Sequence, residues 1–382
     1  MNVAIITWNT RSEYLLKLFE EHPCFDMIPV CVTDNDCHQW GTRVGINNVT
    51  IVSPGTILEL YKAGKIDCAI MPSLSEGVNI SAVDLLLSYG IPIDFLKYAP
   101  IEVFEDKYLS DSERIDRICS YASHSELEAM EIHVTDHCNM KCKNCTMFAG
   151  LVEGEVYADF PKYEAGIHKL HSFFSHVKIF RVLGGEPLLN PELYLYLYLI
   201  RQTFPYTDIR LICNGTLLTS INHKLIQAIK DTKTTVYISH YLPISIKADT
   251  IHAFLSDHDI SHSFSAPITH FNKVYNAKGD TDMEFAFKSC FWRKHGCETM
   301  REGKIATCFV PFAIPYLSDH FHLNIPEDGI IDLFEPGLTL SEIRRRLHTP
   351  FNTCKYCCLR GHSEPWDTFD SITREEIKTW SI

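Results

Sequence analysis

At 382 residues, the chain is long enough for two or three domains, each with its own core. An apolar fraction of 46% and a charged fraction of 22% are those of an ordinary globular protein. The net charge of −13 argues against a sequence-independent nucleic-acid binder, whose affinity would rest on clustered Lys and Arg. The N-terminus has no secretory signal pattern, and the densest apolar stretch, residues 193–200, is too short to span a bilayer. We therefore expect a cytoplasmic protein without a membrane or nucleic-acid partner.

Residues 1–105 predict a small Rossmann-like α/β domain, because apolar β-rich runs alternate with segments of helical spacing. Strands are expected at residues 2–8, 27–33, 49–52 and 67–71, and helices at 12–21, 57–63 and 82–88. The glycines with which a backbone approaches a dinucleotide pyrophosphate are missing after the first strand. Asp34 stands where a ribose-binding acid could lie, but a solvated turn is the preferred interpretation. The phrases KIDCAIMPSLSEG and LLLSYGIPI resemble the N-terminal domains found with nucleotide-sugar-modifying enzymes of cell-surface polysaccharide pathways.

Residues 106–128 are polar with a helical pattern and are interpreted as a connector. A second alternation follows in residues 129–288, where repeated βα units indicate a partial parallel (β/α) barrel. Its strands are expected at residues 131–135, 178–183, 208–213, 235–239 and 260–264, and its helices at 162–175, 192–203, 222–230 and 247–255. Residues 289–382 are less regular and rich in Cys, and are expected to end in a helix at residues 373–380.

The fifteen cysteines cannot form a disulfide framework, because the count is odd and the cytoplasm keeps thiols reduced. Cys24, Cys31, Cys68 and Cys213 lie in apolar strand-like runs and are interpreted as small buried hydrophobes. The others are clustered, and clustered thiolates indicate metal binding.

Cys138, Cys142 and Cys145 form a C-x3-C-x2-C pattern directly after the first barrel strand, where a loop opens onto the ligand-binding face. Three thiolates can hold three irons of a 4Fe–4S cube and leave the fourth iron open to a small molecule. A zinc knuckle, with His137 as a fourth ligand, is the alternative.

Three further motifs accompany the cysteines at strand ends. They are Gly184-Gly185-Glu186-Pro187, Asn214-Gly215-Thr216 and Ser239-His240-Tyr241. With these motifs, roughly residues 129–370 resemble the radical S-adenosylmethionine superfamily. The resemblance implies that S-adenosylmethionine chelates the open iron and that one electron cleaves it to a 5′-deoxyadenosyl radical, which abstracts a carbon-bound hydrogen. It also implies that Gly184, Gly185, Glu186 and Pro187 hold the methionine moiety and that Asn214 and Ser239 lie near the cofactor. One departure is Asn144, where many relatives have an aromatic residue near the adenine.

A second set of cysteines follows the barrel: Cys290, Cys308, Cys354 and Cys357. Gly303 lies between the first two, and the last two form C-x2-C. This pattern resembles the SPASM and twitch domains, and the shorter twitch form, with one auxiliary 4Fe–4S cluster on four cysteines, fits better. Structural zinc on the same thiolates is the alternative.

Cys297 and Cys358 are competing ligands. Cys358 adjoins Cys357, and adjacent residues of an extended segment project oppositely, so both are not expected to reach one cluster. If a substrate radical is deprotonated, the auxiliary cluster could accept its electron, which gives oxidation. Hydrogen donation from Cys297 or Cys358 would give epimerisation instead, although inert thiols are the preferred interpretation.

The expected function is therefore hydrogen abstraction from a small carbohydrate, as an oxidation or epimerisation serving surface polysaccharide synthesis. A peptide maturase is the second hypothesis, and an iron–sulfur scaffold the third. Arg181, His240 and Tyr241 are candidate substrate contacts at the barrel mouth. The superfamily resemblance implies an electron donor of the flavodoxin or ferredoxin type.

Overall fold

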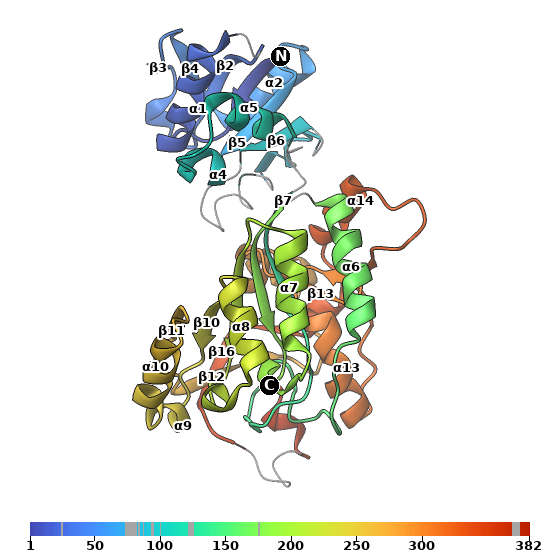
Figure 1. The fold of residues 1–382 in the computed structure, drawn as a ribbon. Helices are drawn as coiled ribbons and strands as arrows, with labels where there is room; N and C mark the ends of the chain where they lie inside the picture. The colour runs from blue at the N-terminus through green and yellow to red at the C-terminus, as the bar shows by residue number, and fades with distance from the viewer. Residues whose placement is uncertain are drawn as a thin grey trace. The chain divides into compact units, whose positions relative to one another are not determined.

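The computed structural model describes residues 1–23, 26–72, 82, 85–86, 88–92, 95–99, 101–120, 126–174, 176–368 and 375–382. The chain divides into two compact units (Figure 1). The first comprises Met1–Glu126 with Thr339–Arg344, and the second comprises Leu127–Leu338 with Arg345–Ile382. The expected α/β fold class is confirmed, and each unit contains a sheet with parallel strands.

The first unit has a six-stranded sheet in the order β3-β4-β2-β1-β5-β6, which is parallel except where β3 joins β4. Its strands are β1 (Asn2–Ile5), β2 (Ile28–Thr33), β3 (Arg43–Val44), β4 (Val49–Val52), β5 (Cys68–Pro72) and β6 (Leu96–Ala99). Its described helices are α1 (Thr10–Glu21), α2 (Pro54–Lys62), α4 (Ile101–Glu105) and α5 (Asp111–Ser120). Outside the described residues lie residues 73–77 of the first polysaccharide-pathway phrase, residues 83, 84 and 87 of the helix expected at 82–88, and Cys24.

Both faces of this sheet are covered, as the apolar runs of its strands require. Val3 packs with helix α1 on one face, while Ala4 packs with helix α2 on the other. Helix α5 lies in the segment interpreted as a connector, yet its Ile115 and Ile118 belong to the same core as Val3. The segment around α5 is therefore part of the first unit's core.

The second unit contains an eight-stranded sheet in the order β11-β10-β9-β8-β7-β13-β14-β15. Five of these strands and four helices coincide with the expected βα units to within a few residues. They are β7 (Glu126–His133), α6 (Phe160–Phe173), β8 (His176–Leu183), α7 (Leu193–Thr203), β9 (Asp208–Cys213), α8 (His223–Asp231), β10 (Thr235–Ile238), α10 (Ala248–Asp257) and β11 (His262–Phe264). A short helix α9 (Leu242–Ser245) precedes α10. The helices start where the sequence supplies caps: Asp159 accepts a hydrogen bond from the backbone of α6, and Asn222 from that of α8.

The sheet continues beyond the expected barrel. Strand β13 (Glu298–Arg301) pairs in parallel with β7, and β14 (Lys304–Ala306) and β15 (Ile330–Asp332) follow antiparallel. The β13–β14 turn lies directly against α6, because a Cβ on Gly166 would come 2.6 Å from the nitrogen of Gly303. This contact, together with a φ of +82° at Gly303, explains the glycine in the second cysteine pattern.

The rest of the second unit surrounds the end of the sheet that carries the cysteines. Strands β12 (His270–Tyr275) and β16 (Cys357–Pro365) form an antiparallel pair. The helices here are α11 (Met283–Ser289), α12 (Phe291–Lys294) and α13 (Val310–Phe321). Helix α14 (Leu340–Leu347) is divided, since its residues up to Arg344 are grouped with the first unit and the rest with the second. The helix expected at residues 373–380 is wrong for the described part, where only a 3-10 turn, Ile377–Thr379, occurs.

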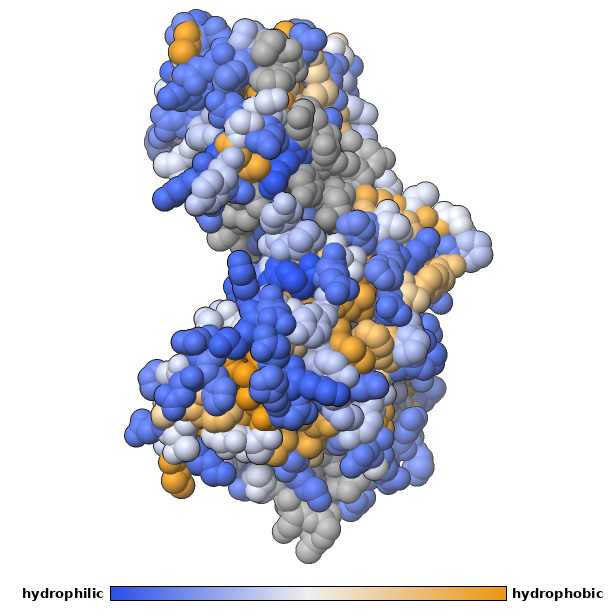
Figure 2. Space-filling model, viewed as in Figure 1, coloured by the Kyte–Doolittle hydropathy of each residue, from blue (hydrophilic) through white to orange (hydrophobic). Residues whose placement is uncertain are grey.

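The densest apolar stretch of the sequence lies in helix α7. No helix among the described residues is both long enough and apolar enough to cross a bilayer. The face shown in Figure 2 is mainly hydrophilic, with small separate apolar patches.

Candidate functional site

The loop after strand β7 brings its three cysteines to one cavity. Cys138, Cys142 and Cys145 line a cavity of about 170 Å³ at the ends of the parallel strands. Of the six cofactor-binding residues expected beside them, four line this cavity: Gly184, Gly185, Asn214 and Ser239. Tyr241 lines it as well. Residues up to about a hundred positions apart in the sequence thus line the same cavity.

The three thiols suit a cationic group. The pKa of Cys138 and of Cys142 is raised to about 12, mainly by burial and in smaller part by the neighbouring Cys145. Burial also raises the pKa of Cys145. Thiols that are buried and close together resist ionisation unless a positive charge compensates them, and bound iron supplies that charge.

The Gly184–Gly185 turn is clamped to the cysteine loop by its backbone. The nitrogen of Gly185 donates to the oxygen of Thr135 at 2.8 Å, and the nitrogen of Glu186 donates to the oxygen of His137 at 3.1 Å. A Cβ at either glycine would lie 2.1 Å from one of these two carbonyl oxygens. The two glycines therefore permit the close approach of two loops.

Glu186 follows the two glycines and is buried. Its carboxylate accepts hydrogen bonds from the nitrogens of Leu188 and Asn214, at 3.1 and 2.7 Å. Burial raises its pKa to about 7, while the two N–H groups act in the opposite direction. Neither Glu186 nor Pro187 is among the residues that line the cavity of the three cysteines. Their expected role in holding the methionine moiety stays a prediction.

Asn139 is a residue of this site that the sequence did not reveal. Its Oδ1 accepts from Asn214 Nδ2 at 2.8 Å, and its Nδ2 donates to Thr216 Oγ1 at 2.7 Å. The side chain thereby ties the cysteine loop to the Asn214-Gly215-Thr216 turn. Its place directly after Cys138 was the available signal.

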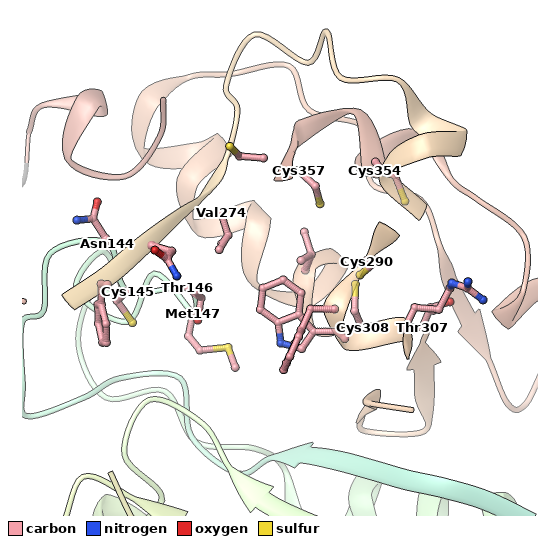
Figure 3. A pocket seen from close by; sticks show the side chains of 18 of the residues that line it. Asn144, Cys145, Thr146, Met147, Val274, Cys290, Thr307, Cys308, Cys354 and Cys357 are labelled. Atoms are coloured by element: carbon pink, nitrogen blue, oxygen red, sulfur yellow. The ribbon is translucent and has the colours of Figure 1, made fainter. Parts of the chain in front are cut away.

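The distal cysteines line a larger cavity of about 720 Å³, which also borders the proximal loop. In Figure 3, one group of labelled side chains gathers on one side of this cavity: Cys290, Cys308, Cys354 and Cys357. The labelled residues on the other side are Asn144, Cys145, Thr146 and Met147. Gly184, Gly185 and Tyr241 line both cavities. Cys145 also borders both cavities, so the two spaces adjoin at this cysteine.

The four distal thiols are mutually close. Burial raises the pKa of Cys308 well above its usual value, and the thiols of Cys290, Cys357 and Cys354 raise it further. Burial likewise raises the pKa of Cys354 to about 11. The donor set has the same chemistry as the proximal one, with a fourth thiol.

Some of the competing ligands and candidate substrate contacts line the cavities, and others do not. Cys358 lines the larger cavity, whereas Cys297 is buried elsewhere and accepts from Arg181 Nη1 at 3.1 Å. Arg181 also approaches Glu131 at 3.7 Å and does not line either of these cavities. Of Arg181, His240 and Tyr241, only Tyr241 lines them.

In the first unit, Asp34 forms the expected turn, since its Oδ1 accepts from the nitrogen of Asp36.

This combination of parallel strands, three cysteines and a Gly-Gly turn defines a class of protein. The model of the Radical SAM superfamily matches residues 132–242. The chain is thus a radical S-adenosylmethionine superfamily enzyme, as its sequence predicted, and this family uses a 4Fe–4S cluster and S-adenosylmethionine. The SPASM or twitch assignment stays a prediction.

Similar proteins have several activities. A GTP 3′,8-cyclase of Staphylococcus carnosus is 30% identical over 105 residues, which span 26% of this chain and only 30% of that relative. The structure of BtrN in complex with AdoMet and 2-DOIA is 16% identical, covers 60% of this chain and 92% of its own, and gives a TM-score of 0.39. SuiB of Streptococcus suis bound to S-adenosylmethionine is 14% identical, covers 50% of this chain and 44% of its own, and gives a TM-score of 0.33.

Proposed function

We propose that this enzyme abstracts a carbon-bound hydrogen from a sugar or sugar derivative, in an oxidation or epimerisation that serves surface polysaccharide synthesis. The observation that carries the proposal is the cavity of about 720 Å³, which borders Cys145 and the Gly184–Gly185 turn as well as the four distal cysteines. A cluster on Cys138, Cys142 and Cys145 would supply the electron that cleaves S-adenosylmethionine to the hydrogen-abstracting radical. A flavodoxin or ferredoxin-type protein is the proposed source of that electron.

The residues of the smaller cavity are proposed to bind S-adenosylmethionine. Gly184 and Gly185 offer backbone groups, and Asn214 and Ser239 offer polar side chains, all beside the three cysteines. Glu186 is proposed to act through its hydrogen bond to the nitrogen of Asn214, which fixes that strand end. These roles leave the larger cavity for the substrate.

The distal cysteines Cys290, Cys308, Cys354 and Cys357 are proposed to hold an auxiliary 4Fe–4S cluster. Their mutual proximity on one cavity and their twitch-like pattern in the sequence support this group. A cluster there would supply a one-electron acceptor next to the substrate space, which favours net oxidation. Cys358 borders the same space, so epimerisation by hydrogen donation stays open.

The lining of the larger cavity supports a small carbohydrate. Its aromatic side chains include Phe271, Phe287, Phe291 and Trp292, and its polar ones include His270, Asn272 and Arg293. Aromatic faces pack against the apolar faces of sugar rings, while a few polar groups fix the hydroxyls. The volume also lies within the range of small-molecule sites.

The test is a turnover screen with carbon-deuterated candidates under anaerobic, reducing conditions. One panel contains nucleotide sugars and amino sugars, and the other contains peptides encoded beside the gene. We expect deuterium in 5′-deoxyadenosine from a member of the sugar panel, and no 5′-deoxyadenosine from the Cys142→Ala variant. Deuterium transferred from a peptide and from no sugar would establish the peptide maturase instead. Undiminished 5′-deoxyadenosine from Cys142→Ala would refute the site assignment itself.

A further inference from the structure

The segment after strand β16 connects the two cysteine sets. Strand β16 begins at Cys357 and pairs with β12, so its start lies beside the distal cysteines. It leads into residues 364–368, which we name the C-terminal strap. The backbone of Trp366 in this strap donates to the oxygen of Thr269 at 2.8 Å, which continues the pairing with the segment before β12.

The strap ends on the proximal cysteine loop. Cys142 and Thr368 form an isolated antiparallel bridge. The nitrogen of Lys143 donates to the oxygen of Asp367 at 2.9 Å, and the Lys143 ammonium lies 2.8 Å from the Asp367 carboxylate. Backbone pairing and an ion pair thus fix the strap against the middle cysteine of the motif.

Asn144 adds a third attachment. Its Nδ2 donates to Glu364 Oε2 at 3.1 Å, and Glu364 also pairs with Lys273 at 2.9 Å. Asn144 has a φ of +59°, a left-handed conformation that Asn tolerates better than most residues. The departure from the aromatic residue of the family motif therefore coincides with a contact to the strap.

Trp366 is the strap residue that faces the cysteine sulfur. Its ring stacks on Tyr241, which lines both cavities, with centroids 5.5 Å apart and planes inclined by 30°. Its indole Nε1 is buried and makes no regular hydrogen bond with the described residues. Burial and Cys145 raise the pKa of the Cys142 thiol, whereas the Trp366 indole N–H lowers it, so this donor lies beside the Cys142 sulfur. Leaving a buried N–H donor without an acceptor is costly, and the sulfur of an iron-bound Cys142 would accept this hydrogen bond.

We propose that Trp366 donates its indole N–H to the Cys142 thiolate of the catalytic cluster and thereby raises the reduction potential of that cluster. The inference rests on the proposed ligation of a cluster by Cys142. A hydrogen bond to a cluster sulfur stabilises the more negative, reduced state, which makes reduction easier. Because the strap continues strand β16, which begins at Cys357, the distal site helps to position this donor.

The experiment is an EPR-monitored potentiometric titration of the reconstituted full-length enzyme. Adding S-adenosylmethionine identifies the catalytic cluster, since only the signal that it perturbs is followed. Trp366→Phe keeps an aromatic ring and removes the donor. We expect the ratio of reduced to oxidised catalytic cluster at a fixed potential to fall roughly tenfold, which is about 59 mV for one electron.

Two further variants make the test specific. Asp367→Asn loosens the strap but keeps the donor, so we expect a smaller shift in the same direction. Trp40→Phe is the matched control, because it removes an indole N–H that bonds the oxygen of Asp34 in the first unit, and we expect no shift. Equal potentials for the catalytic signal in wild type, Trp366→Phe and Trp40→Phe, at equal iron content, would overturn the inference. If Trp366→Phe fails to bind iron, an unchanged potential in Asp367→Asn overturns it. A wild-type enzyme without any signal perturbed by S-adenosylmethionine would refute the proposed function first, and this inference with it.

Discussion

The two cysteine sets line separate cavities, both of which Cys145 borders, and the sets are built in different ways. The proximal set comes from a single loop, residues 138–145, which is fixed by backbone hydrogen bonds to the Gly184–Gly185 turn. The distal set comes from separate segments spread over residues 290–357. Its Cys308 belongs to an apolar core with Phe309 and Leu317, and Cys354 packs with Phe287.

This difference shows which part of the structure holds each cysteine set in place. The proximal loop is held by the ends of parallel strands, which remain in place whether or not the cysteines bind iron. The distal cysteines join segments with little regular structure, so a bound cluster would also link those segments and add to folding free energy. Loss of the cluster at the proximal cysteines should therefore abolish activity, and loss of the cluster at the distal cysteines should also lower the free energy of unfolding.

The largest expected effect is the separation of the two clusters by substitution. Wild-type enzyme should hold about eight irons as two four-iron cubes. A triple Ala variant at Cys138, Cys142 and Cys145 should hold about four and form no 5′-deoxyadenosine, with little change in thermal unfolding. Iron analysis, EPR and product assay measure this. Zinc in place of iron in the triple variant would contradict the auxiliary cluster.

The second prediction concerns the distal set. Cys308→Ala should lose the auxiliary cluster, and its unfolding temperature should fall because a buried core position and a link between segments are lost together. Without iron, we expect a loss of only about 1 kcal/mol for the side chain itself. Cys358→Ala is the matched control, because Cys358 lines the cavity and directly follows Cys357. Equal iron loss in both variants would show that the ligand set differs from the four proposed cysteines.

The same contrast explains what could be predicted from the sequence. The proximal motif is local, and its neighbours Gly184, Asn214 and Ser239 each end a strand with a clear apolar pattern, so topology alone brings them together. The βα units up to β11 could be predicted from the sequence for the same reason. The distal segments have no such periodicity, and the sequence did not indicate that β13, β14 and β15 extend the barrel sheet.

Side-chain orientation was the other limit. Glu186 belongs to the expected motif, but its carboxylate is buried on two backbone donors and the residue does not line the cavity of the three cysteines. Arg181 was expected at the barrel mouth, yet it contacts Cys297 and Glu131. The contacts of Asn139 and Trp366 depend on segments far apart in the chain. Periodicity gives the face of a strand, but not the partner that a long side chain reaches.

A third prediction sharpens the comparison at the clamp between the two proximal loops. Gly185→Ala places a Cβ 2.1 Å from the oxygen of His137, and backbone atoms must move to relieve it. We expect a loss of about 3 kcal/mol or more in unfolding free energy, at the upper end of overpacking effects, and loss of the proximal cluster with the distal one retained. Gly55→Ala is the control, since its Cβ meets nothing closer than 3.8 Å. Normal iron content at both sites in Gly185→Ala would show that the clamp is not required.

The smallest effect is an acid sensitivity on the proximal side. His133 ends strand β7, and burial lowers its pKa to about 4, whereas the unfolded chain keeps a value near 6.5. Between these two pH values the unfolded chain binds a proton that the folded chain excludes, so the native state is progressively destabilised as pH falls from about 6.5 to about 4. The shift corresponds to a loss of about 3 kcal/mol once the pH is below both values. We expect the unfolding free energy of the iron-free protein to fall less steeply over this range in His133→Gln than in wild type, measured by chemical denaturation at several pH values. His223→Gln, at an exposed position at the start of α8, should retain the wild-type slope. Parallel pH profiles for wild type and His133→Gln would mean that another group controls acid unfolding and that this end of β7 is not where protonation acts.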